Sequence, residues 1–123
     1  MSYNYNHVTL VGRLTKDPEW VKISDDLGKA AFFLAVSRNY KKDDGKPETD
    51  FLPITIWGKM GEHAKKLLKK GMPVLVWGRV QIRSYQAESG RQWSVDIVAE
   101  NFQILQAKAA DPIIEDAKSS LQF

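Results

Sequence analysis

Residues 49–85 read TDFLPITIWGKMGEHAKKLLKKGMPVLVWGRVQIRSY and hold two strand patterns with one helix pattern between them. Apolar side chains recur at every second position in residues 49–57 and again in residues 72–85, which is the period of a β-strand. In residues 58–70 they recur instead at i, i+4, i+7 and i+8, which is the spacing of one helix face. The apolar helix positions are Met60, Ala64, Leu67 and Leu68. Lysines in the last turns and Gly71 as the C′ residue predict the end of the helix.

Three further runs with period two flank this segment, at residues 7–14, 29–39 and 92–105, with Gly12 a candidate bulge in the first. Turn-forming or charged loops separate them. Five strands with a single helix between the third and the fourth are the element order of an OB-fold, a small and partly open Greek-key barrel. We therefore expect an all-β, five-stranded OB-fold barrel over residues 1–108.

Charge divides the chain into two parts. Residues 1–108 hold 17 basic and 12 acidic residues, a net charge of +5, whereas residues 109–123 hold one lysine and three acids, a net charge of −2. The strand pattern stops before the second part, so we expect a short, flexible, acidic C-terminal tail there. A basic body favours a polyanionic partner, with the tail left out of the contact.

Composition restricts the class of protein. With 43% hydrophobic residues the 123-residue chain can build a compact core, and with no cysteine it has neither disulfides nor thiolate metal sites. Its first residues, MSYNYNH, lack the pattern of a signal peptide, and no apolar run has membrane-spanning length. These features predict a cytoplasmic protein with no membrane partner.

Strand alternation sorts the side chains onto two faces. The positions predicted to face the barrel interior are Leu52, Ile54, Ile56, Val74, Val76, Val80 and Ile82, and in the last strand Trp93, Val95 and Ile97. The positions predicted to face outward are Phe51, Pro53, Thr55, Trp57, Leu75, Trp77, Arg79, Gln81, Arg83 and Tyr85. Core packing explains large outward rings poorly. Rings interleaved with arginines suit unpaired nucleic acid, because each base can stack for about 1–3 kcal/mol while arginine neutralises phosphate or stacks.

The candidate stacking residues are therefore Phe51, Trp57 and Tyr85, while Trp77 fits either base stacking or a subunit interface. Tyr40, in the loop that follows the second strand, extends the same chemistry. The candidate phosphate-binding cations are Arg13, Arg38, Lys41, Lys42, Lys59, Arg79, Arg83 and Arg91. Together they predict binding of single-stranded DNA with little sequence preference, and no catalysis.

Several motifs resemble those of bacterial and phage single-stranded DNA-binding proteins, the SSB family. They are residues 6–14 (NHVTLVGRL) with Asp17-Pro18-Glu19, residues 51–59 (FLPITIWGK), residues 78–85 (GRVQIRSY) and the Ser89-Gly90 turn. The match covers residues 5–106 in order, and the combination is specific although each motif alone is weak. The resemblance implies an OB barrel assembled as a homotetramer, with a dimer as the alternative, that protects unpaired strands in replication, recombination or repair.

The same resemblance places the main stacking positions on Tyr40, Phe51, Trp57 and Tyr85. The first, second and fourth are often tryptophan in the family, and all remain aromatic here. Family members end in a run of aspartates, an apolar residue, Pro and Phe, a tip that docks on replication and repair proteins. This chain ends in Phe123, the candidate partner-binding residue of the tail, but lacks the proline and the aspartate run. That departure argues against recruitment through the tip.

Two other classes of function stay open. An enzyme would need a clustered acid, base or nucleophile, yet His7 and His63 lie apart and no phosphate-binding glycine loop or metal-binding spacing occurs. We therefore expect no cofactor and no metal. An OB-fold module that binds RNA or a protein partner is the second alternative, because the fold alone does not select the ligand and stacking barely distinguishes the two sugars.

Overall fold

The computed structural model describes residues 3–41 and 45–105, and side chains for residues 3–39 and 45–105. The described elements, in chain order, are β1 (Val8–Leu14), β2 (Glu19–Lys22), β3 (Gly28–Lys41), β4 (Pro47–Trp57), α1 (Gly58–Leu67), β5 (Pro73–Ala87) and β6 (Gly90–Ile104). The helix has ten residues, and no helix in the described part of the chain is long and apolar enough to cross a membrane.

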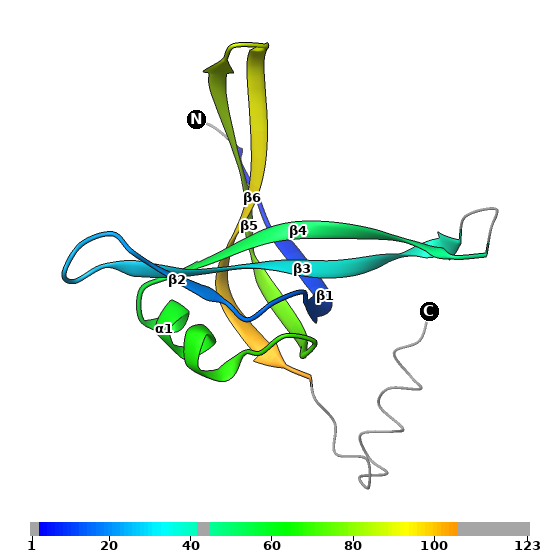
Figure 1. Ribbon diagram of the computed structural model, residues 1–123, viewed down its shortest axis with the longest axis horizontal. Helices are drawn as coiled ribbons and strands as arrows, with labels where there is room; N and C mark the ends of the chain where they lie inside the picture. The colour runs from blue at the N-terminus through cyan, green and yellow to red at the C-terminus, as the bar shows by residue number, and fades with distance from the viewer. Residues whose placement is uncertain (1–2, 42–44, 106–123) are drawn as a thin grey trace, which may run out of the picture.

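Five of the strands close into a barrel. The order across the sheet is β1-β5-β6-β4-β3, and β1 also pairs with β3 through Arg13↔Ala35 and Leu14↔Leu34, which closes the ring. All pairings are antiparallel except that of β4 with β6. The predicted five-stranded OB-fold barrel, with its helix between the third and fourth long strands, is confirmed. Figure 1 shows the barrel with long hairpins projecting from it.

One short strand was not predicted. Strand β2 pairs with the start of β3 at the free edge of the sheet, and Trp20 within it lies half-buried over Gly28. At Gly28 a Cβ atom would lie 2.2 Å from the Trp20 ring, so only glycine leaves room for that indole. Trp20 thus packs against the barrel from this short strand.

The barrel interior follows the predicted alternation. Ile54, Ile56, Val74 and Val76 are fully buried, and Leu52 packs against them. The predicted bulge at Gly12 is wrong, because β1 keeps a regular register with β5 at that position. Gly12 is required instead because the backbone of β3 comes close, and a Cβ atom would lie 2.3 Å from the Ala35 carbonyl oxygen.

Helix α1 covers one end of the barrel and is shorter than predicted. The last helical hydrogen bond runs from the Leu68 N–H to the Ala64 carbonyl, after which the backbone is extended. That change of direction buries Leu68 completely and leaves Leu67 52% exposed, so the predicted apolar face is wrong at Leu67. Gly71 is not the C′ residue. It has φ 83° in the turn before β5, where its N–H donates to the Leu14 carbonyl.

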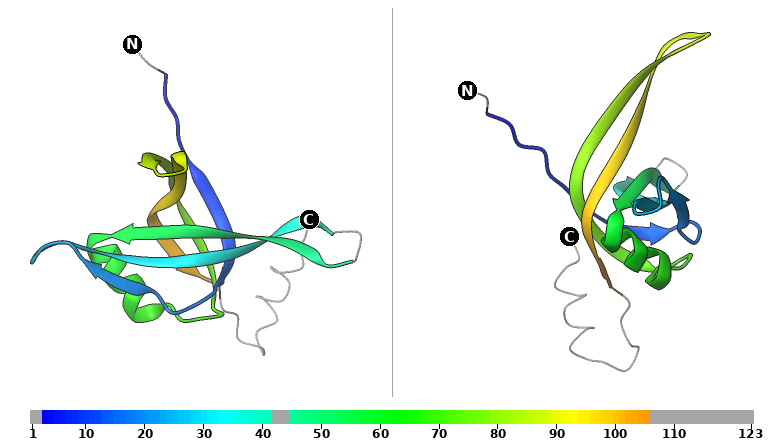
Figure 2. Two further views of the ribbon diagram at one scale, coloured as in Figure 1. Left: turned by 45° about the horizontal axis from the view of Figure 1, so that its top comes forward. Right: turned by 90° about the vertical axis from the view of Figure 1, so that its left-hand side faces the viewer.

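Among the described strands, none pairs with the outer half of the β5–β6 hairpin. β1 pairs with β5 only as far as Gly78, the Asn6 side chain makes the next two bonds with Val80, and the β4–β6 ladder reaches Ile97. Beyond these points the hairpin leaves the barrel (Figure 2). The prediction that Ile82, Trp93 and Val95 face the interior is therefore wrong, and they are 61%, 65% and 45% exposed. They do share one face, which stays exposed in the part of the chain that the structure describes.

Candidate nucleic-acid interface

The outward side chains of four strands form one continuous surface. The registers align Ala31 of β3 with Thr55 of β4, Val98 of β6 and Arg79 of β5. Across this row the Thr55 hydroxyl donates to the Asp96 carboxylate, and each carboxylate oxygen lies 3.0 Å from the hydroxyl oxygen. Thr55 and Val98 are buried although they point outward, so they form the floor of this surface. From this floor the β3–β4 and β5–β6 hairpins diverge (Figure 1).

Trp57 lies at the end of β4 on this surface. Its side chain is 40% exposed, as the outward assignment predicted. Lys29 of β3 pairs with it in register, and the Lys29 Nζ lies 5.0 Å from the centre of the indole ring. The Lys29 ammonium group therefore lies over the indole ring in a cation–π contact and brings a positive charge to the site. Sequence reasoning missed Lys29, because only the strand register brings it to Trp57.

Phe51 precedes Trp57 on β4 and is 62% exposed. Phe33 of the neighbouring strand is 54% exposed on the same outer face. Phe33 pairs with Pro53 while Ala35 pairs with Phe51, so the two rings are diagonal neighbours. Sequence reasoning missed Phe33 as well. Alternation through the buried Phe32 and Leu34 was the signal that could have found it.

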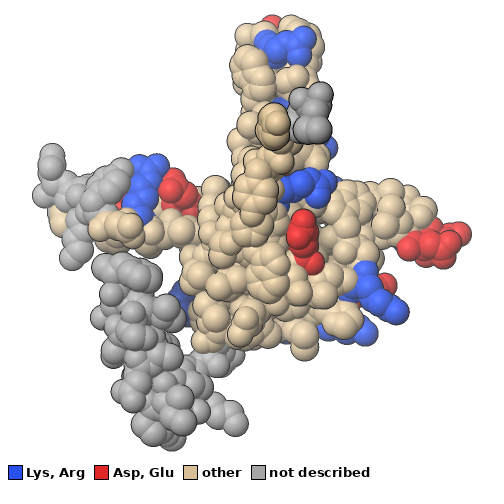
Figure 3. Space-filling model, turned by 180° about the vertical axis from the view of Figure 1, so that it is seen from behind, with Lys and Arg blue, Asp and Glu red and all other residues tan. Residues whose placement is uncertain are grey.

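The β5–β6 hairpin has one polar and one apolar face. The polar face carries Arg79, Arg83 and the 53% exposed Tyr85, in line with the predicted outward set. Space-filling Figure 3 shows basic side chains near the far end of this hairpin, where the sequence has arginine but no lysine. The opposite face carries the exposed Ile82, Trp93 and Val95. Rings and cations of the predicted site thus lie along both diverging hairpins.

Trp77 is not brought together with the other rings. It pairs with Thr9 of β1 and Asn101 of β6, in a row of the barrel wall separate from β3 and β4. Its side chain is half-buried. A register shift between Trp77 and Gly78 separates this row from the hairpin above it.

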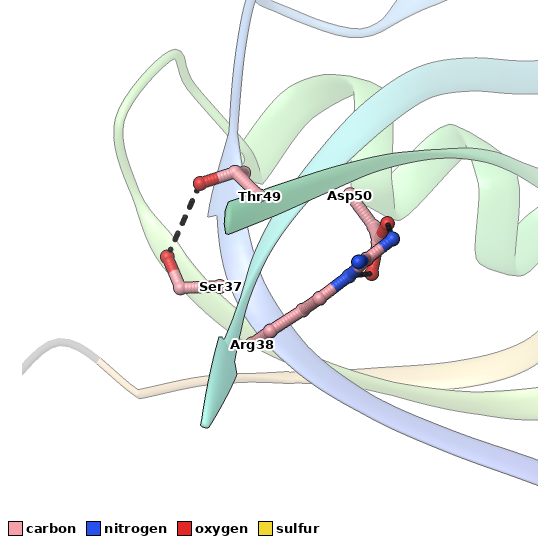
Figure 4. A network of polar contacts seen from close by, with 4 residues as sticks. All are labelled: Ser37, Arg38, Thr49 and Asp50. Atoms are coloured by element: carbon pink, nitrogen blue, oxygen red, sulfur yellow. Dashed lines mark hydrogen bonds and ion pairs between the residues drawn. The ribbon is translucent and has the colours of Figure 1, made fainter. Parts of the chain in front are cut away.

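Two predicted phosphate ligands already have partners. Arg38 donates from Nε to Asp50 Oδ2 at 3.1 Å and from Nη2 to Asp50 Oδ1 at 2.8 Å (Figure 4). By strand alternation this pair lies on the face of the β3–β4 hairpin opposite Phe51. The Arg13 Nη1 donates to the Gly71 carbonyl at 2.8 Å. Neither guanidinium is therefore directed at the rings.

The other predicted residues lie on α1, near the tip of the β5–β6 hairpin or outside the described side chains. Lys59 is exposed in the first turn of α1, and Arg91 is exposed near the hairpin tip, where it donates to the Ser84 hydroxyl at 3.2 Å. Four predictions lie outside the described side chains, namely Tyr40, Lys41, Lys42 and Phe123. Among the described residues no group of three or more His, Asp or Glu side chains could hold a metal ion.

Fold and surface together define an OB-fold barrel that exposes aromatic rings and cations along two projecting hairpins. The chain belongs to the single-strand binding protein family, whose model matches residues 5–105. It is 42% identical over 104 residues to single-stranded DNA-binding protein 1 of Streptococcus pyogenes, covering 84% of this chain and 80% of that protein. It is 47% identical over 104 residues to single-stranded DNA-binding protein 3 of Clostridium acetobutylicum, covering 82% and 71%. The predicted family is confirmed.

Proposed function

We propose that this protein binds single-stranded DNA with little sequence preference and thereby protects unpaired strands during replication, recombination or repair. One observation carries the proposal. Phe51, Trp57 and Tyr85, in a chain whose relatives are named single-stranded DNA-binding proteins, all expose their rings instead of burying them. Such rings are available to flat bases.

Stacking explains both the affinity and the tolerance of sequence. Every base has a π-face, and each one that stacks on an aromatic side chain contributes about 1–3 kcal/mol. Duplex DNA binds far less well on this mechanism, because its bases are already stacked against one another. No bond of the DNA is made or broken, so the proposed role is binding without catalysis.

Cations supply the second part of the interaction. Arg79 and Arg83 line the polar face of the β5–β6 hairpin, and Lys29 lies beside Trp57. Each phosphate that they neutralise releases condensed counterions, so affinity falls with salt at a log–log slope of about −0.7 per phosphate for single strands. We include Lys59, Arg91, Lys41 and Lys42 in this set, and Tyr40 among the stacking rings.

Tryptophan fluorescence tests the proposal directly. Titration with oligo-dT should quench the emission, and a matched duplex should bind at least about tenfold more weakly, a difference of about 1.4 kcal/mol. Oligo-rU run alongside distinguishes DNA from RNA binding. Equal affinity for single strand and duplex, or no quenching by oligo-dT, would show that the surface is not a stacking platform.

We further propose that the protein forms a homo-oligomer, a tetramer or a dimer. The exposed apolar face formed by Ile82, Trp93 and Val95 supports this, since such a patch is stabilised by a partner surface. Val95→Asp would place a charge on the patch, and sedimentation velocity should then show smaller particles than the unchanged protein forms. The same mass for both proteins would exclude this face as the contact.

The proposed binding domain ends at residue 108, and residues 109–123 form a tail outside the DNA contact. A chain truncated after residue 108 should therefore bind oligo-dT at least as tightly as the full chain does. Because the tail is acidic, its removal can only strengthen electrostatic attraction to DNA. Weaker binding by the truncated chain would place part of the DNA site in the tail. Since the protein acts on unpaired cellular or phage DNA, we place it in the cytoplasm.

A further inference from the structure

A cleft lies beside Phe33, and its lining includes none of the aromatic positions that sequence reasoning selected. It has a volume of about 340 Å³ and is formed by the β1–β2 connection on one side and the outer face of β3 and β4 on the other. Its lining residues include Phe33, Pro53, Thr15, Lys16 and Glu19. This volume lies within the range of small-molecule sites, about 300–1,000 Å³, and the lining is mostly apolar with a few polar groups.

The cleft is held in shape by hydrogen bonds. Thr15 donates to the Phe33 carbonyl twice, from its backbone N–H at 3.1 Å and from its hydroxyl at 3.4 Å. Two residues further on, the Asp17 carboxylate accepts from the Lys70 backbone N–H at 2.7 Å. Lys16 lies between these two anchors. The connection is therefore anchored on both sides of Lys16, to Phe33 before it and to Lys70 after it, and a ligand would not have to order it.

The exposed ring itself requires an explanation. Phe33 is 54% exposed in the middle of a long strand, and its diagonal neighbour Phe51 is 62% exposed. A phenylalanine exposed to this extent contributes little to the core, but it offers one flat apolar surface beside a cation. A nucleotide matches that chemistry, because it joins a planar base to a phosphate. Two carboxylates also line the cleft: Asp17 accepts from the Lys70 backbone N–H, and Glu19 can accept a hydrogen bond from the exocyclic amino group of adenine, guanine or cytosine.

We propose that this cleft is an additional nucleotide subsite, in which one base of the bound strand stacks on Phe33 while its phosphate pairs with Lys16. The subsite rests on the proposed function and extends it, since it continues the line of rings from Phe51 towards the β1–β2 connection. It adds one stacked base to those on Phe51, Trp57 and Tyr85.

Full-length variants test the subsite by fluorescence anisotropy with labelled oligo-dT. Phe33→Ala removes the ring, and Phe33→Leu keeps an apolar side chain without a flat face. Both should weaken binding by about 5- to 150-fold, the equivalent of one stacked base. Leu67→Ala is the matched control, because it truncates a similarly exposed apolar residue on α1, and its affinity should stay unchanged. Lys16→Ala combined with Phe33→Ala should cost less than the product of the single effects, since both contact one nucleotide.

Photocrosslinking of the unmodified protein tests the subsite without any substitution that could disturb the fold. An oligonucleotide carrying 5-iodouracil should give an adduct on the peptide that contains Phe33. Absence of that adduct when adducts form at Trp57, or wild-type affinity in Phe33→Leu, would overturn the subsite. If Phe33→Ala changes the sedimentation mass but not the affinity, Phe33 is a contact between copies and the subsite is also wrong. Failure of the unchanged protein to bind oligo-dT would instead refute the proposed function itself.

Discussion

Arg38 of β3 and Asp50 of β4 form a two-bond ion pair (Figure 4), with N–O distances of 2.8 and 3.1 Å, and strand alternation places this pair on the face of the hairpin opposite Phe51. The hydrogen bonds from Arg38, aided by its positive charge, hold the pKa of Asp50 below its ordinary value. The carboxylate therefore stays ionised further into acid, and the pair is lost only as pH falls through that lowered pKa. At neutral pH the guanidinium is directed at Asp50.

Removing the carboxylate should abolish the two hydrogen bonds from Arg38 to Asp50 and take one negative charge off the β3–β4 hairpin. In Asp50→Asn we expect tighter binding of oligo-dT and a salt dependence steeper by up to about 0.7 in log–log slope, the value for one more phosphate. Asp25→Asn is the control, because Asp25 also pairs with a cation, Lys22 at 3.5 Å, in the turn between β2 and β3. Titrations at several salt concentrations measure both slopes. Equal changes in the two variants would mean that only net charge matters.

Truncation of Trp57 should separate stacking from folding. Because the indole is 40% exposed at the end of β4, Trp57→Ala should retain a cooperative thermal melt while its affinity for oligo-dT falls by an amount equivalent to about 1–3 kcal/mol. Trp57→Phe should restore part of the affinity. Circular dichroism on heating and anisotropy titration give the two readouts. Loss of the cooperative transition would instead assign Trp57 to the core.

Arg83 should contribute to the salt dependence. Its side chain is exposed on the polar face of the β5–β6 hairpin, near Tyr85. Arg83→Ala should reduce the magnitude of the log–log salt slope by about 0.7, because one phosphate contact is lost. Lys65→Ala on α1, which removes a charge of the same sign on the helix, is expected to leave the slope unchanged. A similar reduction in both variants would point to diffuse attraction instead of a contact.

Gly61 should be intolerant of any side chain. A Cβ atom at this position would lie 2.1 Å from the Ile56 carbonyl oxygen and 3.2 Å from the Ala30 nitrogen, both of them backbone atoms. Gly61→Ala should therefore force α1 away from the barrel and lower the free energy of unfolding by about 1–3 kcal/mol. Glu62→Ala, one residue along on the exposed side of the helix, should be nearly neutral. Urea denaturation compares the two, and equal stability would show that the helix can shift without cost.

Phe33 and Ile82 show which kind of exposure strand alternation can predict and which kind it cannot. The alternation that buries Phe32 and Leu34 also places Phe33 on the outer face, so the sequence pattern is sufficient to predict that Phe33 is exposed. Ile82 continues the alternation of Val74 and Val76 equally well, yet it is 61% exposed. The two cases differ in neighbours, because β5 has lost its β1 partner before it reaches Ile82. The pattern identifies the face of a strand, and the neighbouring strands determine whether that face is covered.

The amino-acid sequence alone predicts the five barrel strands, the helix between the third and fourth of them, the buried aliphatic row and the family. These follow from periodicity and local motifs, which each segment carries within itself. The pairing of Arg38 with Asp50, the position of Lys29 over Trp57 and the cleft beside Phe33 were settled only by the folded chain. Each depends on strand register or on a connection packed against a distant strand, and such contacts arise when barrel closure brings separate segments together.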